Sequence, residues 1–256
     1  SLSGQRKLVL NDNGMRVLAS ARIFDAISEK QHKGRWELHE MIGAGGAGVV
    51  VCANDKSLKQ RVAIKVVMPA HGGYQGGYFR PEEGKRLRRE ALAMKRVNHP
   101  SIVRLLESFT DDDKIHLLVM EYVTGRSLHD VVTVEGAFSQ SKLNALTEML
   151  LGALCEMHSK NIIHLDIKPA NIMLDEKADG SWSVKIIDFG LAQAPSADSA
   201  SRADVTTMMT QYHSETVAGT LSFMSPEQMS NGMLDFRADV FAVGITLYQL
   251  ATGRFP

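Results

Sequence analysis

The period of the hydrophobic pattern changes along the chain, and this change constrains the fold more than any other feature. From Trp36 the chain passes through three short stretches, "WELHEMI", "GVVVCAN" and "RVAIKVV", which are separated by Gly-rich or polar segments. Such stretches predict a meander of β-strands. A helix is expected at about 82–97 and further strands near 102–109 and 115–122. This part of the chain is therefore predicted to be a small β-rich unit with one main helix.

The second half of the chain has helical spacing. In "SQSKLNALTEMLLGALCEMHSK" the apolar residues that would share one face are Leu143, Leu146, Leu150, Leu154 and Met157. The segment "DVFAVGITLYQLATG", which starts at Asp239, is apolar all round and is predicted to be a buried core helix. It is shorter than the ~20 residues that span a bilayer. The fold class is therefore α+β.

Composition excludes several classes of partner and site. The 29 basic residues balance the 29 acidic ones, so no global field favours nucleic acid or an anionic membrane. Cys52 and Cys155 lie far apart, which favours two buried thiols over a zinc site or a disulfide. No signal or transit peptide is apparent, so we expect an intracellular protein, cytoplasmic or nuclear. Because the chain opens at Ser1 without Met, we expect a segment of something longer.

Two motifs in the β-rich unit each have a structural and a functional explanation. "IGAGGAGVV" places glycines between two strand-like runs, where glycines mostly serve turns. A dinucleotide fingerprint would need a helix after the glycines, so the functional alternative is a hairpin whose backbone covers phosphates. "VAIK" places Lys65 in a strand, where its charge must reach solvent or meet an anion. For Lys65 alone, an edge-strand position is the commoner explanation.

The stretch "HLDIKPAN" gathers three chemically different groups in a short loop. It holds a carboxylate at Asp166, an ammonium at Lys168 and a carboxamide at Asn171. Pro169 lies between them, and a helix interior would not accept it. These groups are therefore predicted to lie on a loop.

Taken in order, the motifs resemble the signature set of eukaryotic-type protein kinases. The set comprises the glycine hairpin, "VAIK", Glu90 in the expected helix, "HLDIKPAN", "IIDFG" and "SPE", and it covers about 35–256. The resemblance implies a bilobal fold, with a small β-rich N-lobe at 35–123 and a mostly α C-lobe at 124–256. Residues 1–34 would form an N-terminal extension. The C-lobe looks truncated, because the chain stops at "LATGRFP", where the family has further helices.

The resemblance also implies an activity: transfer of the γ-phosphate of ATP, with Mg²⁺, to Ser or Thr hydroxyls of protein substrates. Lys168, two residues after Asp166, resembles the serine/threonine class. Neither nucleic acid nor a membrane span is expected, and a regulatory partner is compatible with the sequence. The alternative is a weak or inactive, pseudokinase-like nucleotide-binding scaffold. Degenerate relatives tend to lose residues of the Lys65, Asp166 or Asp188 type, and all three are present here.

The roles of individual residues follow from the same resemblance. Lys65 would hold the α- and β-phosphates and pair with Glu90. Asp166 would accept the substrate hydroxyl proton, and Lys168 would neutralise the γ-phosphate. Asn171 and Asp188 would hold Mg²⁺. The remaining expected ATP-binding residues lie in the glycine hairpin, the adenine pocket and the hinge: Ile42, Gly43, Ala44, Gly45, Gly46, Ala47, Gly48, Val50, Ala63, Met120, Glu121, Val123, Ser127 and Met173.

The sequence departs from the family in its expected activation loop, which contains Thr216 and Thr220. Leu165 stands where the family commonly has an Arg that pairs with a loop phosphate, and Gln193 replaces a frequent second cation. We therefore expect activity to depend only weakly on phosphorylation of Thr216. The alternative is that Arg202 or Arg88 supplies the missing cation.

Overall fold

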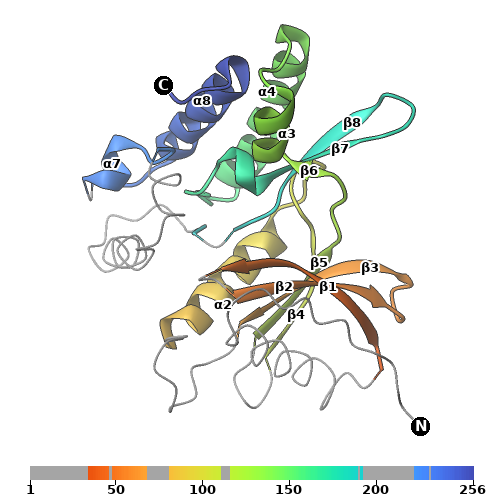
Figure 1. The fold of residues 1–256 in the computed structure, drawn as a ribbon. Coiled ribbons are helices and arrows are strands. Elements are labelled where there is room, and N and C mark those ends of the chain that lie inside the picture. The colour runs from red at the N-terminus through yellow and green to blue at the C-terminus, as the bar shows by residue number, and fades with distance from the viewer. Residues whose placement is uncertain are drawn as a thin grey trace, which may run out of the picture.

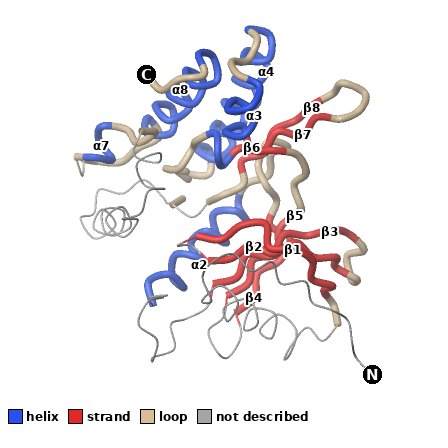
Figure 2. Tube along the Cα trace, viewed as in Figure 1, coloured by secondary structure: helices blue, strands red, loops and turns tan. Residues whose placement is uncertain are grey.

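The computed structural model describes residues 34–45, 48–67, 81–110, 116–189, 191–192, 222–230 and 232–256. The expected N-terminal extension, 1–34, therefore lies almost entirely outside the described residues. The described elements form a part dominated by one β-sheet and a mostly helical part, drawn below and above in Figure 1 and coloured by element type in Figure 2. The predicted α+β class is confirmed.

The first part is a five-stranded antiparallel sheet with one long helix. The strands follow the order β1-β2-β3-β5-β4. Their bounds are β1 Trp36–Gly45, β2 Gly48–Asp55, β3 Gln60–Val67, β4 Leu105–Thr110 and β5 His116–Glu121, and α2 spans Pro81–Arg96. The structure thus confirms the predicted meander and its helix.

Strand register decides which side chains face the helix. Val50 pairs with Lys65, which pairs with Leu118, and Ala63 pairs with Met120. Residues that are paired directly across antiparallel strands project from the same face. This face joins a core that includes residues of α2. The opposite face has a separate buried cluster: Trp36, Val51, Ala53, Val62, Ile64, Val66, Leu117 and Val119.

Within the described residues, the second part contains four α-helices and a small sheet. The helices are α3 Leu128–Glu135, α4 Gln140–Ser159, α7 Pro226–Met229 and α8 Arg237–Thr252. The three-stranded sheet consists of β6 Arg126–Ser127, β7 Ile172–Glu176 and β8 Trp182–Ile186, and the short 3₁₀ helix η1 spans Pro169–Asn171. Gly125 precedes β6 with φ +98, and a Cβ there would lie 2.0 Å from the Leu174 carbonyl oxygen. Only glycine fits this close approach.

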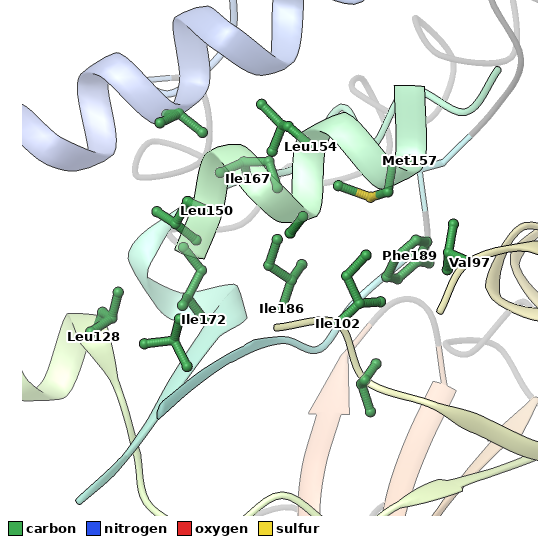
Figure 3. Packing of buried hydrophobic residues seen from close by; sticks show 14 of the residues in the cluster. Val97, Ile102, Leu128, Leu150, Leu154, Met157, Ile167, Ile172, Ile186 and Phe189 are labelled. Atoms are coloured by element: carbon green, nitrogen blue, oxygen red, sulfur yellow. The ribbon is translucent and has the colours of Figure 1, made fainter. Parts of the chain in front are cut away.

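One hydrophobic core joins the two parts. The predicted apolar face of α4 is buried at all five positions, from Leu143 to Met157. Figure 3 shows this cluster continuing from Leu150 and Leu154 to Phe189 and Val97, and Val97 directly follows α2. Next to it, the backbone N–H of Val103 donates to the Ile186 carbonyl at 2.9 Å. The segment after α2 is thereby fixed against β8.

Two expectations about burial were wrong. Helix α8 is not buried all round, because its inward face carries Asp239, Thr246 and Gln249 while Val240 and Tyr248 are 54% and 46% exposed. The inward face is thus mixed, with apolar residues such as Ala242 and Leu250 beside these polar ones, and the described residues do not cover the other face of the helix. Cys52 is buried as expected, but Cys155 is exposed on α4. Within the described ranges, no helix combines the length and apolar character needed to cross a bilayer.

Candidate active site

A buried ion pair connects β3 to α2. Lys65 is 6% exposed and Glu90 is 2% exposed. The Lys65 Nζ lies 2.7 Å from Glu90 Oε1 and 3.1 Å from Asp188 Oδ1. Burial alone would lower the Lys65 pKa, but the carboxylates of Asp188 and Glu90 outweigh it and hold this pKa above its ordinary value. Lys65 is therefore a fixed cation beside Asp188.

The position of Lys65 overturns the edge-strand explanation. Strand β3 pairs with β2 on one side and with β5 on the other. A lysine in a central strand cannot reach solvent along the sheet edge, so its side chain extends from the inner face and meets two carboxylates.

The "HLDIKPAN" loop brings its three polar groups together at one carboxylate. The Lys168 Nζ lies 2.9 Å from Asp166 Oδ1. The Asn171 Nδ2 donates to Asp166 Oδ2 at 2.8 Å and to the Asp166 carbonyl at 2.9 Å. Burial raises the pKa of Asp166, the Lys168 ammonium opposes this shift, and the Asp188 carboxylate adds to it. Asp166 and Asp188 are thus close enough to interact electrostatically.

A buried histidine connects this loop to the segment that carries Asp188. His164 is fully buried, and its Nδ1 accepts a hydrogen bond from the Asp166 N–H at 3.3 Å. Its ring meets Phe189 edge-on with centroids 4.9 Å apart. Burial lowers the pKa of His164, although Asp239 opposes the shift. His164 is therefore neutral at physiological pH, consistent with the acceptor role of Nδ1.

The carboxylate of Asp239 anchors the backbone just before Asp166. Its Oδ2 accepts from the His164 N–H at 2.9 Å and from His158 Nε2 at 2.8 Å, and its Oδ1 accepts from the Leu165 N–H at 2.8 Å. The residue is completely buried at the start of α8. The sequence pattern did not predict this role for Asp239. A lone carboxylate in an otherwise apolar helix was the available signal.

Leu165 has an unusual backbone and an apolar environment. Its φ is +65, a left-handed value that non-glycine residues seldom adopt. Its side chain is 4% exposed and belongs to a cluster with Ile163, Leu234 and Ala238. The residue next to the candidate base is thus held by hydrophobic packing.

The predicted adenine-pocket residues lie on neighbouring elements. Val50, Ala63 and Met120 lie on the inner face of the first sheet, as their register requires. Met173 on β7 pairs with Ser127, whose Oγ accepts a hydrogen bond from the Asp130 N–H and caps α3. Val123 and Met173 line one small cavity together with Lys185.

Glu121, which is expected to lie in the hinge, is held by its side chain. Glu121 Oε1 accepts from the Arg104 N–H at 2.8 Å and from Lys185 Nζ at 2.7 Å. Lys185 lies on β8 and also donates to the Pro100 carbonyl at 2.9 Å. These bonds connect the end of the first sheet to the second part of the protein.

The glycine segment forms the expected hairpin. Gly43 pairs with Val50, Ala44 with Val49, and Gly45 with Gly48, and Ile42 is 45% exposed on β1. A strand therefore follows the glycines, as the phosphate-covering alternative requires. Other expected residues lie outside the described residues: Gly46, Ala47, Gln193, Arg202, Thr216 and Thr220.

The oxygen donors of this site fit a magnesium ion that is coordinated partly by the protein and partly by phosphate oxygens. Across the described ranges, no group of three or more His, Cys, Asp or Glu side chains could hold a metal. Mg²⁺ in nucleotide sites usually takes only one or two protein carboxylates, with phosphate oxygens and water completing the octahedron. The partly exposed carboxylate of Asp188, which pairs with Lys65, and the carboxamide of Asn171, which lies beside Asp166, are donors of this type.

Comparison with known proteins agrees with this geometry. Residues 36–256 match the family model "Protein kinase domain". The chain is 33% identical over 228 residues to the serine/threonine-protein kinase PrkC of Bacillus subtilis, covering 89% of this chain and 32% of that protein. It is 37% identical over 231 residues to the probable serine/threonine-protein kinase PknB of Bifidobacterium longum, covering 87% and 31%.

A third relative gives the same picture. The serine/threonine-protein kinase PknB of Mycolicibacterium smegmatis is 35% identical over 225 residues, covering 87% of this chain and 33% of that protein. The chain thus spans about a third of the length of these curated relatives. With the family model matched over nearly all of the described residues, the chain belongs to the protein kinase family, in its serine/threonine class.

Proposed function

We propose that this chain transfers the γ-phosphate of ATP to Ser or Thr hydroxyls of protein substrates. The observation that carries the proposal is the convergence of Lys65, Asp166 and Asp188: Lys65 on β3 pairs with Asp188, and His164 of the Asp166 loop packs against Phe189, the residue after Asp188. Phosphoryl transfer requires positioning and counter-charge far more than covalent chemistry by the protein. The fixed cation Lys65, the base Asp166 and the metal-binding carboxylate Asp188 together would meet these requirements.

Each residue has a defined role in this proposal. Lys65, oriented by Glu90, binds the α- and β-phosphates. Asp166 orients the attacking hydroxyl and accepts its proton late in the reaction, while ADP leaves with the bonding electrons. Lys168 adds positive charge at the γ-phosphate. Mg²⁺, when bound, neutralises phosphate charge and would be held by Asp188 and Asn171.

The adenine site is proposed next to the hinge. Val50, Ala63 and Met173 would enclose the base, and Met120 would lie at the back of the pocket. The backbone groups of Glu121 and Val123 would offer hydrogen bonds to it. The side-chain bonds of Glu121 to Arg104 and Lys185 support this part of the proposal, because they keep the hinge backbone in one position. The boundary between the proposed lobes, 35–123 and 124–256, falls at this hinge.

The decisive experiment compares the wild-type chain with Asp166→Asn in a radiolabelled ATP-transfer assay on Ser- and Thr-containing peptides. Removing a positioned general base typically costs about 10²–10⁴ in rate, so transfer by the variant should fall by at least about a hundredfold. Binding of a fluorescent ATP analogue should be retained, because Asp166 is not assigned to the nucleotide. Equal transfer by both proteins would refute the assigned mechanism. Nucleotide binding without transfer by the wild type would favour the scaffold alternative.

Phosphorylation of Thr216 is expected to have a small effect. A loop phosphate usually recruits one to three charged hydrogen bonds, each worth about 1.5–3 kcal/mol. Leu165 packs in an apolar cluster and cannot provide one. Moving a two-state loop from 1:99 to 99:1 takes about 5.5 kcal/mol, which the remaining neutral donors would not supply.

The measurement is kcat/KM for Thr216→Ala against the wild type, with phosphorylation of Thr216 in the wild type confirmed by mass spectrometry. A loss of less than about tenfold is expected, which corresponds to 1.4 kcal/mol. A loss of about a hundredfold or more would show that another cation, such as Arg202 or the exposed Arg88, binds the loop phosphate.

A further inference from the structure

The peptide bond that joins Leu165 to Asp166 is held at both ends. Its carbonyl oxygen accepts a hydrogen bond from Gln228 Nε2 at 3.1 Å. Its N–H donates to His164 Nδ1 at 3.3 Å. This peptide leads directly into the candidate base, so its orientation sets the direction in which the Asp166 side chain leaves the backbone.

The same peptide follows a residue with a disfavoured backbone. Leu165 has a φ of +65. Glycine adopts this value without a steric clash, and Asn or Asp can support it with a local hydrogen bond, but a leucine side chain can do neither. Such a conformation persists when its surroundings determine it fully. The Asp239 carboxylate fixes the Leu165 N–H at 2.8 Å, and Gln228 fixes the Leu165 carbonyl. Each side of the residue therefore has its own side-chain anchor.

The hydrogen-bond partners of Gln228 determine the orientation of its side-chain amide. The side chain is 3% exposed. Its Oε1 accepts from the Ser225 N–H at 3.0 Å, at the start of α7, and its Nε2 donates to the Leu165 carbonyl. Reversing the amide would place an oxygen against a carbonyl and an NH₂ against an N–H. Both ends of the amide are thus needed in the observed orientation.

We propose that Gln228 is a positioning residue for phosphoryl transfer: through the Leu165 carbonyl it aligns the Asp166 carboxylate with the substrate hydroxyl. This inference rests on the role proposed for Asp166. The donor must be a neutral amide, since a carboxylate at the same place can only accept hydrogen bonds. Gln228 belongs to α7 and Leu165 to the catalytic loop, 63 residues earlier, so the bond makes the alignment of the base depend on the position of α7.

Two substitutions separate the effect of the hydrogen bond that Gln228 donates from the effect of the one that it accepts. Gln228→Met keeps the length of the side chain and removes both hydrogen bonds. Gln228→Glu keeps an acceptor for the Ser225 N–H but loses the donor to Leu165. We expect kcat to fall about tenfold in both variants at pH 8, because misplacement of a reacting group reduces the rate without changing ground-state binding. The KM for ATP should stay within about twofold of the wild type, because Gln228 does not face the nucleotide.

The pH dependence of kcat in Gln228→Glu distinguishes a positioning role from a purely structural role, because a purely structural role would leave it the same as in the wild type. Burial raises the pKa of an introduced carboxyl, and the neighbouring carboxylates of Glu227 and Asp239 would raise it further, while neutral His164 adds no charge. Once protonated, the carboxyl regains an O–H donor for the Leu165 carbonyl. The ratio of its kcat to that of the wild type should therefore rise as pH falls from about 8 to about 6. The same ratio for Gln228→Met should stay flat.

Gln249→Met is the matched control. Gln249 is also buried, at 6% exposure, but it lies on α8, and among the described residues no hydrogen bond joins its side chain to the catalytic loop. Its kcat should equal that of the wild type. Should both Gln228 variants have a wild-type kcat with only a lower Tm, Gln228 is structural and the inference is wrong. If instead Asp166→Asn is fully active, the proposed function itself has failed, whatever the Gln228 variants do.

Discussion

Replacing Asp188 with Asn, or Lys65 with Met, is expected to reduce kcat/KM for phosphoryl transfer by about a thousandfold or more. The two residues are 3.1 Å apart and would act on the same phosphates, Asp188 through Mg²⁺ and Lys65 directly. Each substitution removes a charge whose contribution to the transition state is worth several kcal/mol. The test is a transfer assay over a range of ATP and Mg²⁺ concentrations.

Stability distinguishes the two variants. Asp188 has a side chain that is 36% exposed, so Asn at this position should leave the Tm almost unchanged. Lys65 is buried against Glu90, so Met at this position removes a partner from a buried carboxylate and should also lower the Tm. Asp179→Asn, in the exposed turn between β7 and β8, is the control for the same chemical change and should be fully active. Unchanged turnover in Asp188→Asn would contradict the assignment of the metal site.

The sequence was sufficient for the parts of the fold that depend on local pattern. Alternating apolar residues located β1, β2 and β3, and the helical spacing of leucines located α4 and its buried face. The loop proposed to carry the base could also be predicted from local sequence, because Asp166, Lys168 and Asn171 are close in sequence and Pro169 excludes a helix interior. Residue type and short spacing were enough in these cases.

The sequence was insufficient where tertiary contacts decide the outcome. The orientation of α8 could not be predicted, because apolar residues lie all round the helix and its inward face is distinguished only by long-range contacts, such as those of Asp239 to the N–H groups of His164 and Leu165. For Lys65 alone, an edge strand seemed the commoner case, because strand order is not visible in one strand. Gln228 shows the same limit: nothing in "SPEQ" reveals a bond to a carbonyl 63 residues earlier.

Asp239→Ala is expected to cause the largest loss of stability. The Asp239 carboxylate is completely buried and accepts three hydrogen bonds, from the N–H groups of His164 and Leu165 and from His158 Nε2. Alanine would leave the two buried N–H groups and the partly exposed His158 ring without this acceptor, and breaking such a buried charged network costs about 3–5 kcal/mol. Urea unfolding monitored by circular dichroism would measure the change in the free energy of unfolding.

The choice of comparison variants makes the test of Asp239 specific. Asp235→Ala removes a carboxylate that precedes the same helix, but Asp235 pairs with the exposed Arg237 and its loss should cost less than about 1 kcal/mol. Asp239→Asn keeps one acceptor oxygen and turns an NH₂ group toward the remaining donors, so it should fall between the two alanine variants. Because the lost bonds hold the left-handed backbone of Leu165, Asp239→Asn should also lower kcat without raising the KM for ATP. An unfolding free energy for Asp239→Ala within about 1 kcal/mol of the wild type would mean that other contacts hold the catalytic loop in place.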